Sequence, residues 1–144
     1  MAPRTDPIGL DVTRTGRVLS RAFNDALAEV GGSLPQWLVV MALKRGDGAM
    51  QRDIAAAVGI EGATLTHHLN RMETDGLVHR ERVAGNRRSQ LVTLTPRGEE
   101  LFSTLLGSVV AFDERLRDGF TDRELATLAK LLARLRDNAS SASP

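Results

Sequence analysis

The residues whose types and spacing could do chemistry gather in one stretch of this 144-residue chain, residues 51–98. Two helix-like segments come first, and the second of them has hydroxyl, amide and basic side chains along one side. Two strand-like segments follow, joined by a tip that contains Arg87 and Arg88. Hydroxyl, amide and guanidinium groups hydrogen-bond to phosphates and to base edges, so the chemistry predicted for this stretch is recognition of DNA.

The second segment, expected as a helix over residues 62–75, has an apolar and a polar face. Leu65, Leu69 and Met72 recur at helical spacing and are expected to face inward. The opposite face is expected to enter the major groove, where threonine suits phosphates or base edges, alanine suits a thymine methyl group, and arginine or histidine suits phosphate or guanine. The alternative is that these residues are merely exposed. The candidate DNA contacts on this face are Ala63, Thr64, Thr66, His67, Asn70 and Arg71.

The hairpin that follows has Asn86, Arg87 and Arg88 at its tip and is expected to act as a DNA-binding wing. An arginine on a thin hairpin can reach the minor groove, where narrow A·T tracts have enhanced negative potential. The alternative is a pair of solvated arginines on an exposed turn, and the position of the hairpin after the helix pair favours DNA. Arg52, near the start of the first helix of the pair, is a further candidate for contact with the DNA backbone.

The elements that must position these residues are mostly helices, because apolar residues recur at steps of three and four along most of the chain. Capping-box patterns mark two helix starts, at Ser33 with Gln36 and at Thr121 with Glu124. The segment over residues 45–48 is expected as a turn. The expected helices span residues 8–30, 34–44, 51–58, 62–75 and 96–118, a last helix follows Thr121, and the expected strands span residues 77–83 and 89–94.

We therefore predict one mainly α (α+β) domain over residues 1–144. A winged helix-turn-helix lobe over residues 34–95 is expected between terminal helices over residues 8–32 and 96–138, with a disordered tail over residues 139–144. The lobe is complete without the terminal helices, so their apolar stripes are expected to pack against those of a second copy. This predicts a two-fold symmetric homodimer, the commonest oligomer.

These patterns resemble the MarR family of bacterial winged helix-turn-helix transcription regulators over essentially the whole chain. The match is carried by the start of the second helix at residues 33–37 and by the helix-turn-helix over residues 54–78. The wing is the most specific part. Residues 86–88, followed by Leu94, Thr95 and Gly98, resemble a family signature usually written Asp-x-Arg and then Leu-Thr-x-x-Gly.

The chain departs from the family pattern at two positions. Asn86 stands where the family usually has aspartate, and an amide cannot pair ionically with a neighbouring arginine. His67 stands where arginine is common, which leaves open which bases are recognised. The resemblance implies that Arg88 enters the minor groove and that Arg87 contacts phosphate.

The resemblance also implies an effector, because family members often release DNA when a small aromatic or anionic molecule binds between the dimerising helices and the winged lobes. The only tryptophan, Trp37, lies where such a crevice would open. The alternative, that Trp37 is simply a core residue, stays open. The residues implied as pocket lining are Arg17, Phe23, Trp37, Met41 and Phe112, with Arg21 as another candidate partner for an anion.

Several classes of protein are excluded by what the sequence lacks. Without cysteine there is no disulfide framework, thiolate metal site or thiol switch. His67 and His68 are neighbours on a helix and point about 100° apart, so we expect no shared metal and no cofactor. No phosphate-binding loop or catalytic triad pattern is present, so we expect no enzyme. Without a signal peptide or an apolar run long enough for a bilayer, we expect a cytoplasmic protein that does not bind membranes.

Charge is distributed in the way that a DNA-binding middle segment requires. The formal net charge is only +1, but residues 61–98 contain six arginines and all three histidines against four acids, whereas acids prevail from Glu99 onward. We therefore expect a sequence-specific, ligand-responsive repressor that binds a pseudo-palindromic operator in double-stranded DNA. The alternatives are a winged-helix protein-interaction module and an architectural DNA binder of low specificity.

Overall fold

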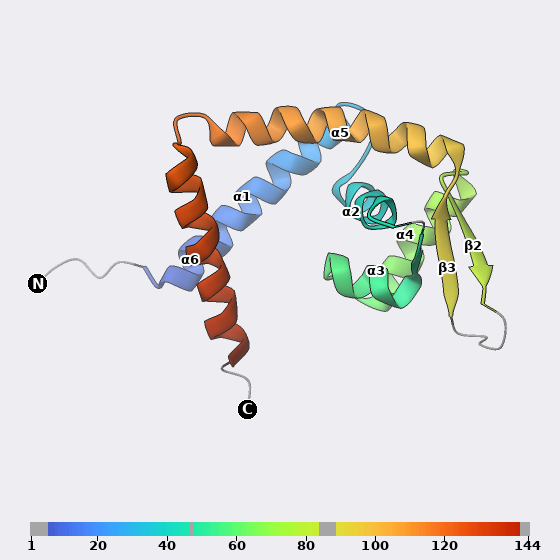
Figure 1. Cartoon of the computed structure of the whole chain (residues 1–144), viewed down its shortest axis with the longest axis horizontal. Coiled ribbons are helices and arrows are strands. Elements are labelled where there is room, and N and C mark those ends of the chain that lie inside the picture. The colour runs from blue at the N-terminus through green and yellow to red at the C-terminus, as the bar shows by residue number, and fades with distance from the viewer. Residues whose placement is uncertain (1–5, 47, 84–88, 142–144) are drawn as a thin grey trace, which may run out of the picture. The chain divides into compact units, whose positions relative to one another are not determined.

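The computed structural model describes residues 6–46, 48–83 and 89–141 and has the expected mainly helical architecture with a small sheet (Figure 1). It divides into two compact units, residues 1–109 and residues 110–144, with the boundary inside a long helix. In chain order the elements are α1 (Ile8–Ala28), α2 (Leu34–Lys44), β1 (Ala49–Met50), α3 (Gln51–Val58), α4 (Gly62–Thr74), β2 (Val78–Arg82), β3 (Gln90–Leu94), α5 (Pro96–Arg117) and α6 (Asp122–Ser141).

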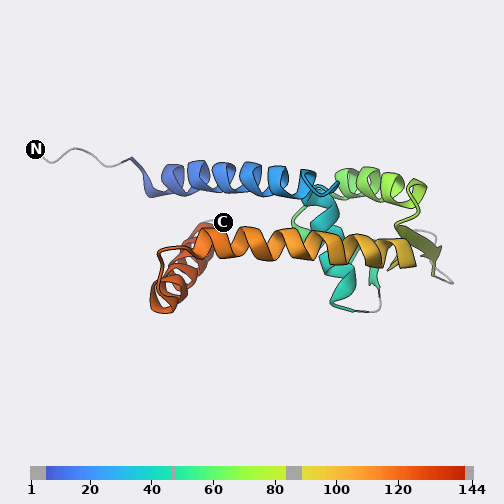
Figure 2. The same cartoon turned by 90° about the horizontal axis from the view of Figure 1, so that it is seen from above.

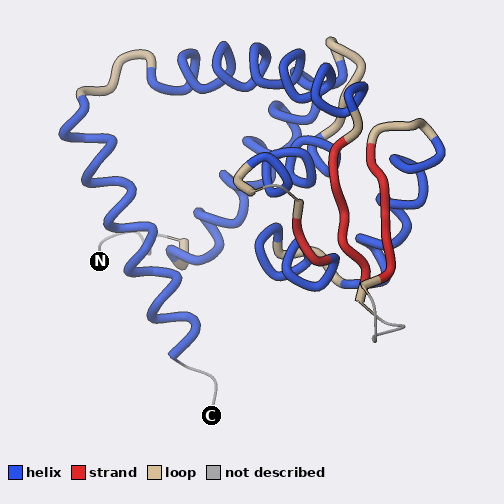
Figure 3. The backbone as a smooth tube through the Cα atoms, turned by 45° about the vertical axis from the view of Figure 1, so that its right-hand side comes forward, coloured by secondary structure: helices blue, strands red, loops and turns tan. Residues whose placement is uncertain are grey.

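The first unit contains a three-stranded antiparallel sheet in the order β1-β3-β2, seen as three neighbouring strands in Figure 3. The long hairpin pairs β2 with β3, with Arg80 opposite Val92. On the other edge, Ala49 of β1 lies opposite the same Val92. Strand β1 was not predicted from the sequence, because a strand of two residues is too short to show an alternating pattern. Its pairing ties the start of α3 to the hairpin.

The core of this unit lies between α2, α4 and the sheet. Leu65 and Leu69 are fully buried and Met72 is 2% exposed, which confirms the expected inward face of α4. Helix α2 also buries residues on more than one side, as its apolar sequence indicates. The buried residues of α2 are Trp37, Val39, Val40 and Leu43.

The junction of the hairpin with α5 is held by close backbone contact. Thr95 caps α5, because its Oγ1 accepts from the backbone N–H of Gly98 at 3.1 Å and donates to the carbonyl of Gly76 at 2.5 Å. A Cβ on Gly98 would lie 2.1 Å from the carbonyl oxygen of Leu77, so only glycine fits there. The Leu-Thr-x-x-Gly pattern therefore fastens α5 to the segment between α4 and β2.

Near its C-terminal end, the long N-terminal helix α1, drawn in blue in Figure 2, contacts α5 inside the first unit. Ser108 donates a hydrogen bond of 3.0 Å to the carbonyl of Ala26. The helix ends at Ala28, before the expected residue 30, because the chain turns through Gly31, whose φ is +83°. Ser33 then caps α2 as expected, accepting from the N–H of Gln36 at 3.3 Å.

The second unit contains the end of α5 and α6. The capping box at the start of α6 is confirmed: Thr121 N–H donates to the Glu124 carboxylate at 2.8 Å, and Glu124 N–H donates to Thr121 Oγ1 at 3.2 Å. The expectation of a disordered tail from residue 139 is wrong for residues 139–141, which continue the helix. Ser140 and Ser141 hydroxyls donate to carbonyls one turn earlier, at 2.9 and 2.7 Å, and so fit a helical end.

Within residues 6–46, 48–83 and 89–141, no helix is both long and apolar enough to cross a membrane.

Candidate nucleic-acid interface

Helices α3 and α4 form the helix-turn-helix, and the turn between them depends on Gly59. This residue has a φ of +68°, a left-handed conformation that glycine adopts without a steric penalty. The backbone N–H groups of Gly59 and Ile60 both donate hydrogen bonds to the carbonyl oxygen of Ala55, at 3.0 and 3.2 Å. This closes α3 and sends the chain into α4, with the buried Leu65 and Leu69 fixing which side of α4 faces the core.

The face of α4 opposite the core is open to solvent. It carries all six residues predicted from the sequence as DNA contacts on this helix, and only Thr66 is partly buried. The five exposed ones are Ala63, Thr64, His67, Asn70 and Arg71.

Thr66 has a role between the two helices that its sequence position did not reveal. Its hydroxyl donates to the carbonyl of Gly62 at 2.9 Å and accepts from Nε2 of Gln51 at 2.7 Å. Because the single hydroxyl proton is used within the protein, Thr66 has only a lone pair to offer to DNA. Gln51 was missed as a site residue, since nothing in its local sequence indicates that it faces α4.

A second connection joins α4 to the hairpin through Arg80, which was also missed. Nη2 of Arg80 donates to Oδ1 of Asn70 at 2.6 Å and to Oε1 of Glu73 at 3.0 Å. The Arg80 side chain is only 13% exposed. Its hydrogen bond and its charge hold the pKa of Glu73 below the ordinary value for that carboxyl. A period of two along β2 places Arg80 on the same side as the buried Val78, a signal that could have found it.

These side chains line a polar groove of about 570 Å³ between α3, α4 and the hairpin. A smaller depression of about 290 Å³ lies on the other side of the exposed face of α4 and contains His67 and Arg71. Asn70 lines both hollows and therefore stands between them. The groove is lined by Gln51, Arg52, Ala55, Gly62, Thr66, Asn70, Arg80 and Gln90.

The wing tip predicted from the sequence, Asn86, Arg87 and Arg88, lies outside the described residues. The two strands that lead to it are described up to the N–H of Val83, which donates to the carbonyl of Ser89 at 3.1 Å. The hairpin lies beside α4 (Figure 1), and Arg80 of β2 contacts Asn70 on the exposed face of that helix.

The histidines of α4 lie in different surroundings. His67 is exposed, whereas His68 is partly buried and lines a separate cavity of about 400 Å³ with Asn24 and Gln36. Their rings are 5.9 Å apart and tilted by 60°. Across the part of the chain that the structure describes, no three histidine or carboxylate side chains come together as a metal site would require.

The residues implied as an effector pocket differ in how far they are buried. Trp37 is buried and stacks on Phe102, with ring centroids 5.8 Å apart, so it is a core residue in this structure. Phe23 and Met41 are partly buried against the same core.

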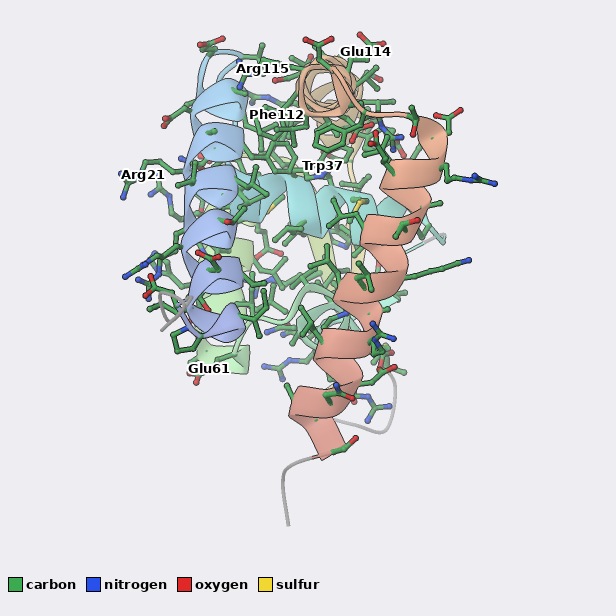
Figure 4. All side chains as sticks on the ribbon, turned by 90° about the vertical axis from the view of Figure 1, so that its left-hand side faces the viewer. Arg21, Trp37, Glu61, Phe112, Glu114 and Arg115 are labelled. Carbon is green, nitrogen blue, oxygen red and sulfur yellow. The ribbon has the colours of Figure 1, made fainter. Side chains whose placement is uncertain are left out.

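The charged candidates for this pocket, Arg17 and Arg21, are exposed on α1, and Figure 4 shows Arg21 pointing away from the helix into solvent. Phe112 belongs to the second unit, where it is buried and Arg115 lies 5.1 Å from its ring centroid.

Comparison with known proteins relates this geometry to transcription regulators. Residues 31–89 match the family model described as the MarR family. Among solved structures, the transcriptional regulator PA3341 is 30% identical, with 94% of this chain and 99% of that one covered and a TM-score of 0.80. The transcriptional repressor CouR, solved bound to a 23-mer DNA duplex, is 24% identical over 94% of this chain and 96% of its own, with a TM-score of 0.83. NadR, solved with 4-hydroxyphenylacetate, is 23% identical over 94% and 96%, with a TM-score of 0.72.

Proposed function

The chain belongs to the MarR family of transcription regulators, and from this premise we propose that it binds double-stranded DNA with α4 and the hairpin and thereby regulates transcription. The observation that carries the proposal is the solvent-facing polar side of α4, placed beside a hairpin whose tip sequence contains two arginines. CouR, which has the same fold, was solved on DNA. A recognition helix in the major groove would bring His67, Asn70 and Arg71 to base edges or phosphates.

In this proposal the remaining arginines supply contacts that do not depend on sequence. Arg52 is exposed at the rim of the polar groove and is assigned to the DNA backbone. Arg87 and Arg88 are assigned to phosphate and to the minor groove, on the sequence of the wing and its family resemblance. Neutralising about six to eight phosphates per dimer gives a slope of log K against log salt of roughly −5 to −7.

The proposed active form is a homodimer. Helix α6 buries none of its residues within the chain, and Leu128 and Leu131 on its apolar stripe are 46% and 43% exposed. On α1, Ile8 and Val18 are 62% and 67% exposed. Covering these side chains with a second copy would remove apolar surface from water and would present two recognition helices to DNA. Two such helices bind half-sites about 10 bp apart, which asks for a pseudo-palindromic operator.

We further propose that the protein is a repressor that a small aromatic or anionic molecule releases from DNA. The supporting observation is NadR, a similar fold solved with 4-hydroxyphenylacetate. Trp37 is the only tryptophan, so its fluorescence reports any ligand that disturbs its stacking on Phe102. A ligand releases DNA only when it binds the DNA-incompetent form more tightly than the competent one.

The test is a gel shift and footprint on the DNA upstream of the gene for this chain, with excess non-specific competitor and a salt series. Arg71→Ala and Arg88→Ala are expected to weaken binding at least about tenfold, whereas Arg123→Ala on the exposed start of α6 serves as the matched control. A competitor-resistant, two-fold symmetric footprint supports the proposal.

If that DNA gives no complex, fragments selected from the whole genome decide the matter. Complete failure of selection would favour a winged-helix module that binds protein. Complexes without sequence preference would instead favour an architectural DNA binder.

A further inference from the structure

The amide of Asn70 is held by a charged group from another element. Arg80 extends from β2 to α4, and each hydrogen of its Nη2 has an acceptor: Oδ1 of Asn70 at 2.6 Å and Oε1 of Glu73 at 3.0 Å. The Arg80 side chain is 13% exposed, so it cannot easily leave this position, whereas Asn70 itself is exposed. The arginine thus holds an exposed side chain of the recognition helix from the protein side.

The chemistry of the two groups decides which end of the Asn70 amide is left for DNA. A guanidinium carries only donors, so the atom facing it must be the amide oxygen and not the NH₂ group. This oxygen is committed to a charge-assisted hydrogen bond, one of the strong kinds in proteins. In the part of the chain that the structure covers, no group accepts from Nδ2 of Asn70. The oxygen, with one lone pair in use, faces the largely buried Arg80, so the exposed side chain turns its two N–H donors toward solvent.

The position of Asn70 makes this difference relevant to specificity. It lies between the polar groove and the depression that contains His67 and Arg71, at the middle of the face proposed to enter the major groove. A free asparagine recognises adenine with both ends of its amide, accepting from N6 and donating to N7. An asparagine that offers only donors instead suits guanine, whose O6 and N7 are both acceptors, and it is repelled by the amino group of cytosine.

From this geometry we propose that Arg80 is a positioning residue that makes Asn70 a donor-only contact, which selects guanine over adenine at one position of each half-site. The proposal rests on the proposed DNA-binding function. Glu73 completes the arrangement, because its carboxylate takes the second hydrogen of the same nitrogen and keeps the guanidinium from turning. Neither Arg80 nor Glu73 needs to touch DNA for this selection to operate.

The test is selection of preferred sequences from a randomised duplex library, with the full-length wild-type protein and three variants. Asn70→Asp keeps the contact with Arg80 but replaces the outward donors with an acceptor, so guanine should give way to cytosine at one position only. Arg80→Met frees the amide oxygen, so the adenine-to-guanine ratio at that same position should rise about tenfold, while other positions keep their preferences. Glu73→Gln is the control for charge, because a glutamine oxygen can still accept from Nη2 of Arg80 and hold the guanidinium against Asn70, so this variant should keep guanine.

The outcomes are distinct. If Asn70→Asp weakens binding to all sequences alike without changing any base preference, Asn70 contacts phosphate or nothing and the proposal is overturned. A change at different positions for Asn70→Asp and Arg80→Met would also overturn it. Thermal melting identifies a variant that has lost its fold, and Asn70→Asp, which retains its partner, then decides alone. If the wild type itself enriches no sequence, the proposed function fails and this inference falls with it.

Discussion

Helices α4 and α6 are both amphipathic, with a stripe of large apolar residues, but the two stripes differ in how far the rest of the chain buries them. In α4, Leu65 and Leu69 are fully buried by the rest of the first unit. In α6 no residue is buried, and Leu128 and Leu131 keep almost half of their surface in solvent. The local pattern is the same in both helices, so it determines which face is apolar but not what covers it.

This difference separates a self-sufficient part of the molecule from a part that depends on a partner. The lobe that positions the proposed DNA contacts has its core within one chain, so its geometry does not require a second copy. The apolar face of α6 does not stabilise the single chain, because leucines that stay exposed to water gain nothing from the hydrophobic effect. We expect stability of the lobe and assembly through α6 to respond to separate substitutions, and the predictions below test that separation.

The largest effect is expected from truncating the buried stripe. Leu69→Ala removes a fully buried side chain and leaves a cavity, which should lower the free energy of unfolding by about 2–5 kcal/mol. Urea denaturation followed by circular dichroism measures this loss. Leu131→Ala is the matched control on α6. It should change the free energy of unfolding much less at a protein concentration too low for dimers, and an equal loss in both variants would refute the comparison.

The second prediction addresses the exposed stripe. Leu128→Glu combined with Leu131→Glu places charge on the proposed dimer surface and should weaken association by at least about 3 kcal/mol, roughly 100-fold, since burying one leucine contributes about 1.5–3 kcal/mol. Sedimentation velocity over a range of concentrations measures the change. The variant should keep the circular dichroism spectrum of a folded lobe. An unchanged dimer would show that α6 does not mediate assembly.

Gly98 tests the junction between the hairpin and α5. Gly98→Ala would place a methyl group 2.1 Å from the carbonyl oxygen of Leu77, and the backbone shift needed to relieve this contact should cost about 1–3 kcal/mol. Gly107→Ala, on the same helix with no atom beyond that helix's own nearby backbone within 4 Å of the added carbon, should be neutral or stabilise by up to about 1 kcal/mol. Thermal melts should therefore show a lowered midpoint for Gly98→Ala and an unchanged or raised midpoint for Gly107→Ala, and an equal decrease in both would contradict the assigned contact.

Local sequence signals were sufficient to predict a structural feature where a residue and its partner are close in sequence. The starts of α2 and α6 follow from capping residues three positions apart. The end of α3 follows from Gly59, because glycine is the residue that most readily adopts the left-handed conformation found there. The inward face of α4 follows from spacing on one helix. The mainly α winged fold was therefore predictable from the sequence, apart from β1 and the last turn of α6.

Contacts between elements were not accessible in the same way. Gln51 meets Thr66 across the helix-turn-helix, and Arg80 meets Asn70 and Glu73 only because the hairpin folds back beside α4. Thr66 and Asn70 were predicted from the sequence as DNA contacts, but the two residues that restrain them were not. Which face of α4 is exposed was predictable, whereas which hydrogen-bonding groups remain free on that face depends on tertiary packing.

The smallest predicted effect concerns the ion pair behind that face. Because Arg80 lowers the pKa of Glu73 in the folded chain, the folded state binds a proton there less readily than the unfolded one. The resulting stabilisation is complete above the ordinary glutamate pKa of about 4.3 and is lost as pH falls through the lowered value. Glu73 is 41% exposed, so Glu73→Gln should cost less than about 1 kcal/mol at neutral pH.

This difference between Glu73→Gln and the wild type should shrink as the solution becomes more acidic than about pH 4, in urea denaturation repeated across pH. Glu114→Gln on the exposed side of α5, labelled in Figure 4, is the control and should follow the wild type throughout. A difference that stays constant with pH would mean that Glu73 stabilises the lobe by packing and not by its charge. Arg80 would then be held mainly by Asn70, and the two restraints on the recognition helix would reduce to one.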